Sequence, residues 1–157
     1  PVLPIEVKNI GNLPVELLQK PYVLSSTDIV IPVNKTSKEL YIIGNTSMPK
    51  GYPVECDYGD KVAEYIIEYA DGGEDRFVAV NGEDLTTATM LHGSSRINPV
   101  ASNCIRAITF SYDKNFEWYL VNVKKIEVNS ERKIKNIRIH SLDSSYNLLI
   151  YGITAVV

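Results

Sequence analysis

Apolar residues recur at every second position along most of this chain, and almost never with the spacing of a helix. Alternation of this kind puts one side of an extended strand in a core and the other side in solvent. Ile137 and Ile139, for example, alternate with Arg138 and His140, which predicts inward isoleucines and outward polar side chains. The one helix candidate is 14–20, which is too short for more than about two turns. The pattern therefore predicts an all-β chain with little or no helix.

Turn signals divide the chain into strands, which are longer in the second half. The expected strands are 29–33, 39–44, 61–69, 74–80, 104–112, 116–128, 134–141 and 148–156. The pair Asp71-Gly72 predicts a tight β-hairpin between the third and fourth of these, because glycine supplies the positive φ that such turns need. Pro32 places the first strand at a sheet edge or a strand end, since proline cannot donate to a ladder.

Strict alternation is expected along 104–112, with Ile105, Ala107 and Thr109 on one face. Consecutive strands without intervening helices are typical of an antiparallel β-sandwich or jelly roll, whereas parallel strands would need crossover helices. A length of 157 residues suits one core. We therefore expect a single β-sandwich domain over 1–157, with 1–28 as an extended lead-in. Because the chain begins at Pro1 rather than Met, we expect it to be a piece of a larger protein.

Charge and cysteine content narrow the functional classes. The net charge is −3 and the basic residues are scattered, which argues against a nucleic-acid partner. No apolar run is long enough to span a membrane, so no membrane partner is expected. Cys56 and Cys104 lack the spacing of a metal site. Cys104 lies in an apolar stretch and is expected to be a buried thiol, and a disulfide with Cys56 stays open.

Residues suited to catalysis are few. His140 falls on the polar face of a strand, and His92 has no nucleophile motif beside it. The aspartates fall in turns, where capping of the backbone explains them. We therefore expect no enzyme activity and no catalytic residues. Residues 71–75 have the oxygen density of a calcium site, although the hairpin explains them as well, so a structural calcium ion stays open and no other cofactor or metal is expected.

Several segments together resemble a known class of domain. They are Ile42 to Ser47, the strand and turn from Glu64 to Gly72, Val80 to Leu85, Ile134 to Ile139, and Leu149 to Thr154. Their order is similar to that of the non-catalytic β-sandwich domains of bacterial polysaccharide-degrading enzymes, of the galactose-binding-like jelly-roll kind. The resemblance covers about 29–154. It implies that the chain is a carbohydrate-binding or carbohydrate-associated accessory module of a glycoside hydrolase-associated protein. The parent protein would be secreted and lie outside the cell or on its surface. The implied partners are an oligo- or polysaccharide and the parent's catalytic domain.

Sugar binding needs exposed aromatic faces for the apolar side of the ring and planar polar groups for its hydroxyls. The candidate ligand-binding residues are Tyr52, Tyr58, His92, Arg96, Tyr112 and Trp118. Packing inside the domain explains the aromatic candidates equally: Trp118 would then lie between the sheets and the tyrosines would anchor loops. The alternative function is accordingly a structural or interaction domain that packs against a catalytic partner and binds no glycan.

Overall fold

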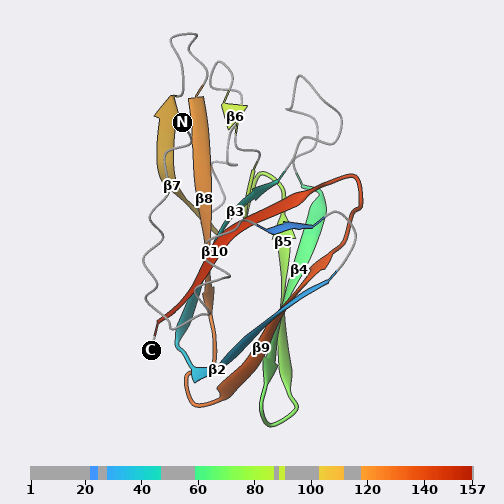
Figure 1. Ribbon diagram of the computed structural model, residues 1–157, viewed down its shortest axis with the longest axis vertical. Helices are drawn as coiled ribbons and strands as arrows, with labels where there is room; N and C mark the ends of the chain where they lie inside the picture. The colour runs from blue at the N-terminus through green and yellow to red at the C-terminus, as the bar shows by residue number, and fades with distance from the viewer. Residues whose placement is uncertain are drawn as a thin grey trace.

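The computed structural model describes residues 22–24, 28–46, 59–86, 89–90, 103–111 and 118–156. This part of the chain forms ten strands and no helix, which confirms the all-β prediction (Figure 1). The strands are β1 Tyr22–Leu24, β2 Ile29–Thr36, β3 Glu39–Thr46, β4 Lys61–Tyr69, β5 Glu74–Val80, β6 Thr89–Met90, β7 Cys104–Ser111, β8 Trp118–Glu127, β9 Lys133–Ser141 and β10 Leu148–Val156. The helix candidate 14–20 lies outside the described residues, and β1 falls within the segment expected to be a lead-in.

The strand pairings are those of a jelly roll. Four antiparallel pairs, β1·β10, β2·β9, β3·β8 and β4·β5, nest one inside the next, as in a single long ribbon folded back on itself. Successive pairs lie in alternate sheets, and the wrapping brings β10 beside β3 and β9 beside β4. One sheet therefore runs β1-β10-β3-β8 and the other β2-β9-β4-β5, with β6 and β7 as additional strands on β8. An antiparallel β-sandwich is thus confirmed, with the double-sheet wrapping of a jelly roll.

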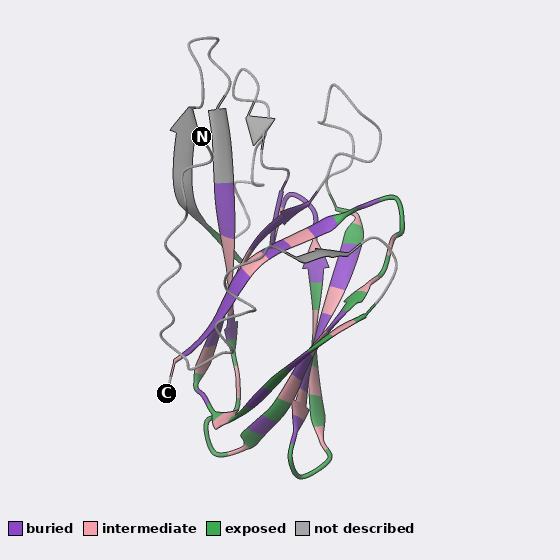
Figure 2. Cartoon of the chain, viewed as in Figure 1, coloured by how far each residue is buried: buried purple, intermediate pink, exposed green. Residues whose placement is uncertain are grey.

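The core lies between the two sheets. Its buried side chains alternate with exposed ones along the strands, so purple and green segments alternate in Figure 2. Ile137 and Ile139 are fully buried whereas His140 is exposed, which confirms the faces predicted for β9. These aliphatic side chains exclude water along the length of the sandwich, and that burial is the main source of stability in such a fold.

Local turn chemistry positions the edges as predicted. β4 and β5 form the expected hairpin, and Gly72 has the left-handed φ of 91° that its turn requires. β2 is an edge strand, and Pro32 lies next to a break in its register with β9. Proline at this position and a bulge are two devices that blunt a sheet edge against unwanted pairing.

The alternation predicted for 104–112 is wrong over part of that strand. β7 pairs with β8, but its register shifts between Arg106 and Ile108. The extra residue, Ala107, has no partner in the ladder, so the two-residue period is broken at this point. A bulge of this kind bends a strand and cannot be recognised from apolar spacing alone.

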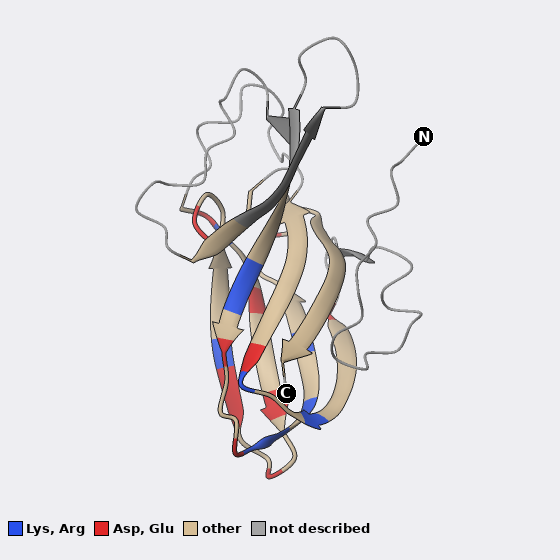
Figure 3. Ribbon diagram, turned by 90° about the vertical axis from the view of Figure 1, so that its left-hand side faces the viewer, with Lys and Arg blue, Asp and Glu red and all other residues tan. Residues whose placement is uncertain are grey.

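Charged side chains on both sheet faces are paired with one another. Acidic and basic segments lie next to each other on neighbouring strands in Figure 3. On the β3–β8 face, Lys125 contacts Glu39 at 2.8 Å. On the outer face of the other sheet, Arg76 contacts Glu64 at 3.0 Å, and Arg138 pairs with Glu68. Exposed pairs of this kind contribute little to stability, but they leave the faces electrically balanced.

Candidate functional site

All six candidate ligand-binding residues belong to segments that join the described structure at one end of the sandwich. β3 ends there at Thr46, before the segment that carries Tyr52 and Tyr58. β6 ends there at Met90, before the segment of His92 and Arg96. The cross-strand partners of Trp118 are Ser111 and Met90, so β7 ends and β8 begins at the same level. We call this end, uppermost in Figure 1, the loop-bearing end.

The candidates themselves are only partly placed. Residues 52, 58, 92, 96 and 112 lie outside the described residues. Trp118 is the first residue of β8, opposite Ser111 of β7, and its side chain is outside the described part of the chain. Whether these residues form one binding face therefore stays a prediction, whereas the convergence of their strand ends is a property of the fold.

A buried polar layer lies at the base of the loop-bearing end. It consists of Asn45, Thr46, Thr86 and Asn122, all at most a few per cent exposed. The carbonyl oxygen of Thr86 accepts hydrogen bonds from the Thr46 N–H at 3.0 Å, from Asn45 Nδ2 at 3.2 Å and from Asn122 Nδ2 at 3.4 Å. Two asparagine amides thus hold the segment that follows the Asn81-to-Leu85 turn against β3 and β8.

Several oxygens of this polar layer remain available as acceptors. Oδ1 of Asn45, Oδ1 of Asn122 and Oγ1 of Thr46 are buried and have no hydrogen-bond partner within the described part of the chain. A buried acceptor without a partner costs about 1–3 kcal/mol. Such groups are usually satisfied by ordered water or by a bound molecule. The layer therefore contains buried acceptors that are not used within the described part of the chain.

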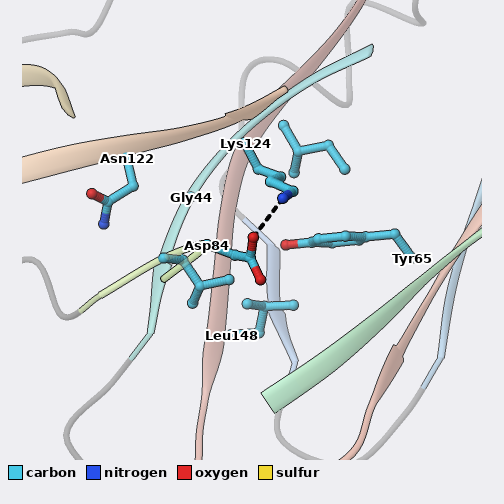
Figure 4. Close-up of a pocket in the computed structure, with 8 residues that line it drawn as sticks. Gly44, Tyr65, Asp84, Asn122, Lys124 and Leu148 are labelled. Carbon is cyan, nitrogen blue, oxygen red and sulfur yellow. Dashed lines mark hydrogen bonds and ion pairs between the residues drawn. The ribbon is translucent and has the colours of Figure 1, made fainter. Parts of the chain in front are cut away.

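Next to the polar layer, Asp84 and Lys124 form a buried ion pair (Figure 4). Nζ of Lys124 lies 2.5 Å from Oδ1 of Asp84, and the Val80 N–H donates to Oδ2 at 2.8 Å. Tyr65, labelled in the same view, has its hydroxyl end toward the pair. Burial, followed by the charge of Asp84, raises the pKa of the Tyr65 hydroxyl, so this group keeps its proton at neutral pH.

A small cavity adjoins the pair, between Ile42, Leu85, Leu148 and Asn122. Its volume of ≈ 10 Å³ is space for about one water molecule. A sugar ring is far larger, so glycan cannot enter this cavity.

The acidic turn at 71–75 lies at the opposite end of the sandwich, where its carboxylates are paired with other residues of the protein. Arg132 Nε donates to Asp71 at 2.8 Å, and its guanidinium carbon lies 3.8 Å from the centre of the Tyr69 ring. The Tyr69 hydroxyl donates to Asp75 at 2.6 Å, and Glu74 pairs with Arg76. Each of the three carboxylates of this turn therefore has a partner in the protein. The described residues contain no group of three or more His, Cys, Asp or Glu arranged for a metal ion.

The Asp71–Arg132 contact predicts a pH dependence. Arg132, followed by the Gly73 N–H, lowers the pKa of Asp71 from 3.8 to about 2. The unfolded chain binds this proton near pH 4. The contribution to stability is therefore complete above about pH 4 and is lost as pH falls toward about 2. In an Arg132→Gln variant the pKa of Asp71, followed by NMR titration, is expected to rise toward 3.8. A value that stayed near 2 would show that Arg132 is not the main cause.

The described residues bear on the expectations for the cysteines and for membrane spans only in part. Cys104 is half-buried rather than buried, and Cys56 lies outside the described residues, so whether the two form a disulfide stays open. Cys104 pairs in register with Lys124, which places it beside the ion pair at the inner side of β8. Among the described residues, no helix is long and apolar enough to cross a membrane.

The Asp84–Lys124 pair was not predicted from the sequence. Asp84 was explained as a turn residue, and its partner lies 40 positions away. The available signal was Lys124 itself, which shares its strand face with the buried residues Asn122 and Ile126. A charged residue at an inward position of a strand needs a buried partner.

Comparisons with protein-family models, with curated proteins and with solved structures found no match for this chain.

Proposed function

We propose that this domain is a non-catalytic accessory module that binds an oligo- or polysaccharide through its loop-bearing end. The observation that carries the proposal is the convergence of three strand ends, at Thr46, Met90 and Ser111, on one end of a jelly roll. The segments that follow them hold every aromatic and planar polar candidate. A rigid polar layer below would let these segments present a preformed surface, which lowers the entropic cost of binding.

The mechanism would be targeting. A weakly binding module raises the effective concentration of a linked catalytic domain at its polymer, without chemistry of its own. Weak, reversible contacts suit this role, because the enzyme must move along its substrate. The parent protein would then be a secreted or cell-surface bacterial enzyme, as the resemblance to polysaccharide-degrading enzymes implies.

The proposal predicts saturable binding to a glycan, measured by calorimetry and tryptophan fluorescence across plant, algal and host polysaccharides. We expect Tyr52→Ala and Trp118→Ala to weaken binding roughly tenfold or more, equivalent to about 1.4 kcal/mol for each factor of ten. Tyr41→Ala is the matched control, because Tyr41 lies on the outer face of β3 beside Lys125, away from the loop-bearing end. The proposal fails if no glycan binds, or if the control weakens binding as much as the two variants do.

A second candidate function rests on an apolar row on the outer face of the β3–β8 sheet. Ile43, Val123 and Ile105 are directly opposite one another on β3, β8 and β7. Ile105 is 53% exposed. Ile43 and Val123 are half-buried, and an aliphatic row with one exposed member suits contact with another protein surface. This observation favours a domain that packs against the parent's catalytic domain.

If the domain packs in this way, Ile105→Asp would weaken association of the two domains and leave glycan binding unchanged.

A further inference from the structure

Lys124 and Asp84 are placed for a covalent bond as well as for an ion pair. Lys124 reaches the pair from β8 in one sheet, and Asp84 from the turn that follows β5 in the other. Their side chains are only 15% and 4% exposed, and Nζ lies 2.5 Å from Oδ1. A nitrogen this close to a carboxyl oxygen is also near the carboxyl carbon, in the range of about 3–3.5 Å from which attack begins.

The surroundings of the pair supply what amide formation requires. Ile42, Leu85 and Leu148 line the adjoining cavity and shield the pair from bulk water. The Val80 N–H already donates to Oδ2 of Asp84 at 2.8 Å. A donor in this position stabilises the negative charge that develops on Oδ2 during attack. The hydroxyl end of Tyr65 also faces the pair (Figure 4).

We propose that Lys124 and Asp84 form an intramolecular isopeptide bond. A proton passes from Nζ to the carboxylate, which leaves a neutral amine and a neutral acid. The Nζ lone pair attacks Cγ, and negative charge develops on Oδ2 opposite the Val80 N–H. The Cγ–Oδ1 bond then breaks, and Oδ1 leaves as water after it takes a second proton from the nitrogen. One amide and one water result, without oxidant, reductant or co-reactant, and the cavity has space for that water.

The bond would fasten the base of the loop-bearing end. It would tie β8 to the turn 81–85, which Thr86 and the two asparagines of the polar layer hold in place. The bond would close the chain between positions 84 and 124 into a covalent loop, which restricts the conformations of the unfolded chain. This inference does not rest on glycan binding, because it concerns only residues inside the sandwich.

Mass spectrometry of the intact 157-residue chain under denaturing conditions tests the proposal. We expect a mass lower than the sequence mass by one water, and a branched peptide that joins the segments of Asp84 and Lys124. Lys124→Arg and Asp84→Ala are expected to have their full sequence masses.

Two results would overturn the proposal. One is the full sequence mass for the folded wild-type chain, with Asp84 and Lys124 in separate linear peptides. The other is a loss of water that persists in Lys124→Arg, because dehydration at Asp71-Gly72 would then explain it. Both results leave the glycan-binding measurements unaffected, so failure of the crosslink is distinguishable from failure of the proposed function.

Discussion

Replacing Lys124 by methionine is expected to lower the free energy of unfolding by about 3–5 kcal/mol relative to a chain that holds the ion pair, because the carboxylate of Asp84 is then buried without a cation. Relative to a crosslinked wild type, loss of the crosslink adds to this effect. Asp84 is only 4% exposed and has little access to water. Its remaining donor is the Val80 N–H, which cannot balance a full charge. Urea denaturation measures this loss as a lower midpoint, provided that the slope m of the transition is the same in both proteins.

The double variant Lys124→Met, Asp84→Leu separates the cost of a lone charge from other effects. A buried ion pair replaced by apolar side chains of similar size is often neutral or stabilising. We therefore expect the double variant to be more stable than either single variant. None of the three variants can form the isopeptide bond, so the comparison among them reports the charge alone. A double variant that is less stable than both single variants would contradict this account.

Local rules predicted the strands of this protein better than their partners. The 61–80 hairpin follows from Asp71-Gly72, and the edge position of β2 follows from Pro32, because each depends on the backbone chemistry of one or two residues. The nested pairs β1·β10 and β2·β9 join segments about 100 or more positions apart. Alternation marks which side of a strand is apolar, but it does not say which strand lies beside it.

The candidate site divides in the same way. Exposed aromatic and planar polar residues in irregular segments could be recognised from composition, and the fold adds that their anchors share one end. The buried polar layer and the Asp84–Lys124 pair could not be found from spacing, because their members are brought together only by the wrapping of the two sheets. Asn45, Thr86 and Asn122, for example, belong to three separate segments, and both asparagine side chains donate to the carbonyl of Thr86.

Tyr146 illustrates a residue whose role only the fold reveals. The segment 142–147 separates two of the expected strands, yet Tyr146 is 1% exposed and belongs to the core. Asp143 shapes this turn, because its Oδ1 accepts from the N–H and hydroxyl of Ser145 and its carbonyl from the Tyr146 N–H. The Tyr146 hydroxyl donates to Asp60 at 2.9 Å, at the point where the chain returns from the loop-bearing end to β4.

Tyr146→Ala is expected to lower the free energy of unfolding by about 3–5 kcal/mol, as for other large aromatic side chains removed from a core. Tyr146→Phe keeps the ring and loses the hydroxyl that donates to Asp60, so we expect a loss of about 1 kcal/mol. Urea denaturation of both variants measures the difference, which reports how much of the effect is packing. Equal losses in the two variants would mean that the hydroxyl, rather than the ring, is what holds this turn against the core. If the ring dominates as expected, Tyr146→Phe remains folded and becomes the variant of choice for asking whether the Asp60 contact also supports the segment that carries Tyr52 and Tyr58.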